Sequence, residues 1–245
     1  MTMRPVLASF LAFLWVALAQ GAFAGQLIVI DSTTPELAPG QILDGSKPLR
    51  LAAGARVTLV AEDGQVTTLK GPFSGVPGAG PGVPAGGSLI RSLSQLITGP
   101  SSDSSVLAVT RGRADPADAW AVKLARSVNV CVRAGGTLVL RKKKSRSAKI
   151  LTIKALPDGA ETSVAWPAGS DRIGWPKGLA LKDKGRYLAR IASMKRLAGM
   201  SGRTAETTLI VRLVPAGLPS DAHRAAWMAE IGCMGQARAL LAGLR

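Results

Sequence analysis

Few residues in this sequence have the types and spacing that a catalytic or metal site requires. Its single histidine, His223, stands beside Arg224 early in an expected helix, which is typical of a solvated surface residue rather than a general base. Asp171 and Asp183 could meet across a loop, but their spacing does not specify a pair. Gly-x-Ser-x-Gly, Ser-x-x-Lys, His-Glu-x-x-His and paired-cysteine metal motifs do not occur. We therefore expect no enzyme activity and no catalytic, cofactor-binding or metal site, with a hydrolase whose site is assembled from distant residues as the alternative.

The two cysteines, Cys131 and Cys233, form an even pair with no competing partner. In an oxidising compartment such a pair is expected to be bonded. The alternatives are a reactive thiol or a metal site, but neither cysteine has a Cys-x-x-Cys partner or a nearby histidine. We predict a disulfide that joins the C-terminal helical segment to a sheet.

The densest chemical signal is a run of basic residues that lies between two candidate strands. We interpret it as the tip of a hairpin. A polyanion-binding site is one of two equally weighted interpretations of this tip, because clustered cations attract phosphates and carboxylates. The alternative is a solvated loop whose lysines protect a sheet edge from pairing. The residues of the candidate site are Arg141, Lys142, Lys143, Lys144, Arg146 and Lys149.

The N-terminus has the pattern of a signal peptide over residues 1–24. Arg4 precedes an apolar run at 6–19, and Ala22-Phe23-Ala24 predicts cleavage after Ala24. A retained membrane anchor is the alternative, but the run is shorter than the about 20 residues that span a bilayer. We expect a periplasmic or secreted protein with no transmembrane segment after cleavage. Its partner would be an envelope protein, or an anionic glycan or lipid such as lipopolysaccharide, anionic phospholipid or peptidoglycan. Nucleic acid is not an expected partner, because an exported protein does not share its compartment.

Charged residues are unevenly distributed along the chain. The 245 residues include 31 Lys or Arg and 15 Asp or Glu, for a net charge of +16. Residues 25–110 are nearly neutral, so the excess of basic residues lies in 111–245. The Gly/Pro-rich stretch at 75–88 is predicted as a linker, or as an ordered but irregular loop, between the two parts.

The N-terminal part reads as short strands separated by glycines. Glu62-Asp63-Gly64-Gln65 predicts a hairpin with a two-residue turn. The segment PGQILDGSKPLRLAAGARVTLVAEDGQVTTLKGP, residues 39–72, resembles the FecR-like domain of bacterial envelope proteins. That resemblance implies a small β-meander over 25–74 that relays signals or scaffolds rather than catalyses. Strand candidates are 26–30, 49–51, 57–59 and 66–69.

After the Gly/Pro-rich stretch, residues 89–110 are predicted to connect the two parts. Ser88 is expected to cap a helix over 89–97, with Leu89, Leu93 and Leu96 on one face, and 106–109 is a candidate strand.

Residues 111–218 are predicted as a basic β-sandwich. Asp183-Lys184-Gly185-Arg186-Tyr187 resembles the tyrosine corner of immunoglobulin-like sandwiches, although Ala189 stands where antibody domains have a cysteine. Trp166-Pro167 and Trp175-Pro176 either plug the end of this sandwich, which we favour, or form an aromatic ligand platform. The strand candidates are 127–133, 137–141, 149–156, 162–166, 187–192 and 207–214.

Residues 219–245 are predicted to be helical. Ser220 is the expected cap, and Gly232 and Gly235 are expected to break the helix. Its apolar face would pack against the sandwich, with a helix resting on a membrane as the alternative. The sequence thus predicts a mainly β fold: a FecR-like β-meander, then an immunoglobulin-like sandwich with a helical tail. The expected function is that of a non-enzymatic exported envelope protein acting as a structural, sensory or adaptor module, with polyanion binding as the alternative.

Overall fold

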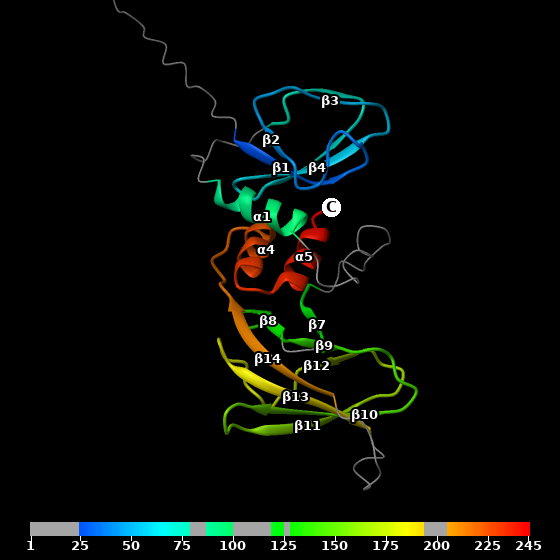
Figure 1. Ribbon diagram of the computed structural model, residues 1–245, viewed down its shortest axis with the longest axis vertical. Helices are drawn as coiled ribbons and strands as arrows, with labels where there is room; N and C mark the ends of the chain where they lie inside the picture. The colour runs from blue at the N-terminus through cyan, green and yellow to red at the C-terminus, as the bar shows by residue number, and fades with distance from the viewer. Residues whose placement is uncertain (1–24, 79–86, 100–118, 125–127, 194–204) are drawn as a thin grey trace, which may run out of the picture.

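The computed structural model describes residues 25–78, 87–99, 119–124, 128–193 and 205–245. Within them the protein is mainly β, which confirms the predicted fold class. Figure 1 shows a small β unit at one end, helices in the middle and a second, larger β unit at the other end. The predicted signal peptide at 1–24, the predicted strand at 106–109 and most of the Gly/Pro-rich stretch lie outside the described residues.

The N-terminal unit has a four-stranded antiparallel sheet in the order β2-β1-β4-β5 and a two-stranded sheet, β3-β6. The strands are β1 (Gln26–Ser32), β2 (Ile42–Asp44), β3 (Leu49–Leu51), β4 (Arg56–Ala61), β5 (Val66–Lys70) and β6 (Phe73–Gly75). The order departs from a simple meander because β3 leaves the main sheet to pair with β6. Strand β1 is buried on both faces: Leu27 and Val29 belong to the core of this unit, whereas Ile28 and Ile30 pack against the helices.

The β4–β5 hairpin is confirmed, but its turn is not the predicted two-residue type. The Ala61 N–H donates to the Gln65 carbonyl at 3.0 Å, which leaves a loop of three residues. Gly64 alone in this loop has a positive φ, of 80°, while Asp63 accepts the Gln65 N–H at 2.8 Å. A three-residue hairpin loop needs a single left-handed residue, at its last position, and glycine adopts that conformation without strain.

Among the described residues, three helices form the middle of the molecule and share one apolar core with both β units. They are α1 (Ser88–Thr98), α4 (Asp221–Glu230) and α5 (Met234–Ala242). Helix α1 contacts β1, α4 and α5, as its leucine spacing predicts for a helix that packs on a sheet. Cys131 and Val214 bring the C-terminal β unit into the same core. The N-terminal and C-terminal parts, which differ so much in charge, are therefore joined by buried contacts.

The predicted cap of α1 is wrong, and the predicted cap of α4 is confirmed. Ser88 is the first residue of α1, and Gly87 holds the cap position without a side-chain hydrogen bond. The Glu62 carboxylate of the β4–β5 hairpin instead accepts the N–H groups of Leu89 and Ile90, at 3.1 and 3.3 Å. It thereby satisfies two N–H groups that lack a partner within the helix, and its charge favours the helix N-terminus. Ser220 caps α4 by accepting the N–H of the third helical residue.

The helical tail breaks at one predicted glycine and not at the other. Gly232 has a φ of 85° and separates α4 from α5, whereas Gly235 lies within the first turn of α5. A glycine inside a helix costs only about 1 kcal/mol relative to alanine. The burial of Ala237, Leu240 and Leu241 in the shared core outweighs that cost.

The C-terminal unit is a two-layer β-sandwich. A five-stranded sheet in the order β11-β10-β13-β14-β8 faces a three-stranded sheet in the order β12-β9-β7. The strands are β7 (Ala121–Lys123), β8 (Val128–Arg133), β9 (Val139–Arg141), β10 (Lys149–Ala155), β11 (Glu161–Trp166), β12 (Arg172–Gly174), β13 (Arg186–Ser193) and β14 (Ala205–Val214). Alternate residues of both sheets, such as Leu140, Leu151 and Leu209, are buried between the layers. The sequence analysis did not predict strands β7 and β12.

Tyr187 closes one end of this sandwich. Its hydroxyl donates to the Ala180 carbonyl at 2.7 Å and accepts the Lys182 N–H at 3.0 Å. The ring is buried and stands edge-on to Trp175, with ring centres 5.1 Å apart. This single side chain ties the loop before β13 to the core.

Replacing Tyr187 by phenylalanine should lower the free energy of unfolding by about 2 kcal/mol, because two hydrogen bonds of about 1 kcal/mol each are lost. The edge-on contact of the ring with Trp175 should survive the change. Urea unfolding measures the difference. A variant as stable as the wild type would show that water replaces the hydroxyl without cost.

Candidate functional site

The basic run is a crossover between the two sheets of the sandwich, and its prediction as a hairpin tip is wrong. Strand β9 pairs with β12 and β7 in the three-stranded sheet, while β10 pairs with β11 and β13 in the five-stranded sheet. The intervening residues, 142–148, therefore pass from one layer to the other, and we call them the cationic crossover. Partner choice is decided by sheet packing across the core, so the two neighbouring strands do not pair with each other.

The six predicted site residues fall into two groups. Lys143, Lys144 and Arg146 are exposed, whereas Arg141, Lys142 and Lys149 are half-buried. The backbone of the crossover runs beside the loop before β12: the Lys142 N–H donates to the Asp171 carbonyl at 3.0 Å, and the Ser145 carbonyl accepts the Gly169 N–H at 2.8 Å. The three exposed cations are thus carried by a segment whose backbone is fixed at two points.

Lys142 differs from its neighbours because its amine is turned onto the sandwich. The Lys142 Nζ lies 4.8 Å from the centre of the Trp166 ring and donates to the Ser170 carbonyl at 3.2 Å. Burial lowers the pKa of this amine below its ordinary value, the charge of Lys149 lowers it further, and Asp171 opposes both effects. Lys142 therefore packs the crossover against the core, and its side chain is less exposed than those of Lys143 and Lys144.

The structure adds two cations that the sequence analysis missed. In the three-stranded sheet Arg141 is paired in register with Arg172 of β12 on one side and with Lys123 of β7 on the other. Their neighbours in register, Val122 and Leu140, are buried, so the three basic side chains lie on the outer face of the sheet. Arg141 also contacts Asp171, with 3.9 Å between the guanidinium and the carboxylate.

The tryptophan rings of the two Trp-Pro pairs pack in or against the core of the sandwich. Trp166 is fully buried, and its indole N–H donates to the Ser170 carbonyl at 3.2 Å. The indole N–H of Trp175 donates to the Leu179 carbonyl at 2.7 Å. Trp166 belongs to the sandwich core and the half-buried Trp175 packs against it, which supports the interpretation that the two rings plug its end.

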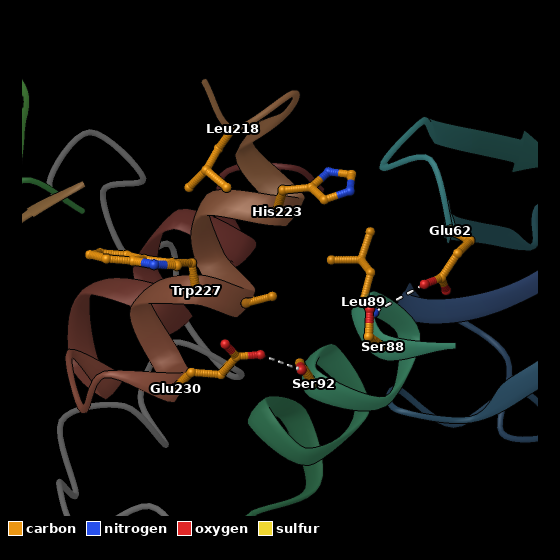
Figure 2. Close-up of a pocket in the computed structure, with 9 residues that line it drawn as sticks. Glu62, Ser88, Leu89, Ser92, Leu218, His223, Trp227 and Glu230 are labelled. Carbon is orange, nitrogen blue, oxygen red and sulfur yellow. Dashed lines mark hydrogen bonds between the residues drawn. The ribbon is translucent and has the colours of Figure 1, made fainter. Parts of the chain in front are cut away.

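A second candidate is a shallow pocket of about 200 Å³ between α1, α4 and the β4–β5 hairpin. Figure 2 shows His223 and Glu230 on α4 on one side, and Glu62 with the start of α1 on the other. His223, expected to be a solvated surface residue, is half-buried at the edge of this pocket, and its Nδ1 lies 2.9 Å from the Ser220 hydroxyl. A side chain on Gly64 would collide with both of these groups, so the hairpin approaches them closely.

The ionisable groups of this pocket have structural partners. Glu62 caps α1, and Glu230 accepts the Ser92 hydroxyl at 3.0 Å (Figure 2).

The two aspartates that the sequence analysis considered as a pair, Asp171 and Asp183, have separate partners in the sandwich. Asp171 contacts Arg141, while Asp183 contacts Arg212 and accepts the Leu213 N–H. Among the described residues no group of three His, Cys, Asp or Glu is placed to hold a metal ion.

Cys131 of β8 and Cys233, between α4 and α5, form the predicted disulfide, with 6.1 Å between their Cα atoms. Gln236 reinforces the same junction: its amide accepts the Cys131 N–H and donates to the carbonyls of Cys131 and Ala119, at 2.8 to 2.9 Å. The disulfide and the Gln236 hydrogen bonds thus fix the helical tail to the sandwich.

Comparison of the sequence with models of known families and with curated proteins finds no match. The resemblances to FecR-like and immunoglobulin-like domains therefore stay predictions. In the part of the chain that the structure describes, none of the helices has the length and apolar character needed to cross a bilayer.

Proposed function

We propose that this chain is an exported, non-enzymatic protein of the bacterial envelope that binds anionic envelope components through the cationic crossover. One observation carries the proposal: the crossover joins two strands that each have a partner on both sides, β9 between β12 and β7, and β10 between β11 and β13. Lysines protect a sheet when they lie on an edge strand. Edge protection therefore does not account for the exposed Lys143, Lys144 and Arg146.

The charge distribution supports the same function. The three exposed cations lie within four positions, in a chain with a net charge of +16. Basic residues next to an anionic membrane each contribute about 1 kcal/mol of binding free energy. Together the three would contribute about 3 kcal/mol to adsorption on lipopolysaccharide, anionic phospholipid or peptidoglycan.

Export is supported by the disulfide, since such bonds persist in oxidising compartments such as the periplasm. A structural or adaptor role is the second candidate, and the helical core favours it. That core joins two β units into one body with two separate surfaces, an arrangement that suits a protein which bridges two partners.

Flotation with lipid vesicles tests the proposed function. The purified protein should bind vesicles that contain phosphatidylglycerol and not vesicles of phosphatidylcholine alone. Raising the salt from about 0.15 M to about 1 M shortens the screening length from about 8 Å to about 3 Å and should release the protein. Equal binding to both vesicles, or binding that resists salt, would contradict an electrostatic site.

A further inference from the structure

Strand β11 forms one edge of the five-stranded sheet of the sandwich (Figure 1). The Ala155 N–H donates to the Ala160 carbonyl at 2.9 Å, so every second residue after Ala160 is hydrogen-bonded to β10. The residues between them direct their backbone N–H and carbonyl groups away from the sheet, and they are Glu161, Ser163 and Ala165. In the described part of the chain these backbone groups have no hydrogen-bond partner.

The other edges of the sandwich are short or covered. Strands β7 and β12 have three residues each, and the Gln236 amide bonds to both backbone groups of Cys131 on the free side of β8. Short edges, covering segments, lysines and prolines are the devices that prevent a sheet from pairing with another chain. Strand β11 has six residues and contains neither lysine nor proline. Its edge is therefore open to a further strand.

The open edge is complementary to itself. When two copies of β11 pair antiparallel about a two-fold axis at Ser163, Glu161 of each copy lies opposite Ala165 of the other. All of the outward-facing residues then form hydrogen-bonded pairs, and no like charges are opposed. On the inner side of the sheet the half-buried Thr162 lies opposite Val164, a pair of β-branched side chains that packs well across strands.

We infer that β11 is the contact edge of a symmetric homodimer in which the two five-stranded sheets become one. The axis of such a dimer is perpendicular to the sheet, because it relates two antiparallel strands of one continuous sheet. It therefore places the cationic crossovers of both copies at the same height along the axis. Simultaneous contact of two crossovers with one anionic surface would strengthen adsorption, but pairing of the edges does not depend on anion binding.

Sedimentation velocity of the purified protein tests the dimer. The wild type should sediment as a dimer at about 100 μM in about 1 M salt, where the repulsion between two basic copies is screened. Ser163→Pro removes an outward N–H without removing a hydrogen bond to β10, so it should weaken association about thirtyfold, the effect of two lost backbone hydrogen bonds. Ser163→Ala, which also loses the hydroxyl contact with Thr152 but keeps its N–H, is the matched control and should dimerise like the wild type.

Disulfide cross-linking tests the register and does not depend on the folding of the proline variant. Ser163→Cys should form a covalent dimer on mild oxidation, because directly paired residues have Cα atoms about 5.5 Å apart. Glu161→Cys is the control, since its two copies would lie about 13 Å apart along the strands and should cross-link far more slowly.

A wild type that stays monomeric under these conditions would overturn the dimer, as would a Ser163→Pro variant that folds and associates as strongly as the wild type. Equal or faster cross-linking of Glu161→Cys would overturn the register and the inference with it. None of these results touches the proposed function, because vesicle binding is measured separately and weakens in the high salt that favours the dimer.

Discussion

Replacing Cys131 and Cys233 together by alanine should lower the free energy of unfolding by about 4 to 5 kcal/mol. The bond closes a segment with a sequence separation of 102, for which the loss of chain entropy in the unfolded state corresponds to about 4.7 kcal/mol. Both cysteines are buried in the core that joins the helices to the two β units. Loss of the bond should therefore weaken the whole molecule rather than one loop.

Denaturant unfolding with and without a reductant measures this effect. The wild type should fall to the stability of the double alanine variant when it is reduced, and the variant itself should not respond to the reductant. A difference below about 1 kcal/mol between oxidised and reduced protein would mean that the Gln236 hydrogen bonds and the apolar core hold the tail without the bond.

Changing Lys143, Lys144 and Arg146 together to glutamine should reduce binding to phosphatidylglycerol vesicles roughly 100-fold. Each residue contributes about 1 kcal/mol near an anionic surface, and about 1.4 kcal/mol corresponds to a factor of ten in affinity. The free energy of unfolding should change by no more than about 0.5 kcal/mol, because all three side chains are exposed. Lys142 is left unchanged because it packs against Trp166.

A matched variant controls for the loss of net charge. Changing Lys177, Lys182 and Arg186 to glutamine also removes two lysines and one arginine from exposed positions of the same β-sandwich. This variant should bind the vesicles nearly as well as the wild type. If both variants lose the same affinity, net charge drives adsorption and the crossover is not a site.

The sequence predicted those parts of the fold whose signal is local. Alternating apolar residues identified β10 and β13 nearly to their ends, and the apolar face of α1 was read from its leucine spacing. Ser220 was recognised as a cap because the helix it caps follows it directly. In each case the deciding residues lie within a few positions of one another.

Features that depend on distant residues could not be read in this way. Glu62 caps α1 across a separation of 27 positions, and no local pattern reports that contact. The pairing of β9 with β12, rather than with β10, is decided by packing between layers. Lys123 and Arg172 belong to strands of three residues, which are too short to show a period, so their alignment with Arg141 appears only once the register is known.

The central claim is that the cationic crossover contacts an anionic surface. Lysine acetylation with mass-spectrometric readout, in the presence and absence of phosphatidylglycerol vesicles, tests it most directly because it reports each amine separately. Lys143 and Lys144 should be protected by the vesicles, while Lys47, Lys177 and Lys182, which are also exposed, should react at unchanged rates. Protection at Lys47 or Lys177 without protection at Lys143 and Lys144 would contradict the assignment of the site.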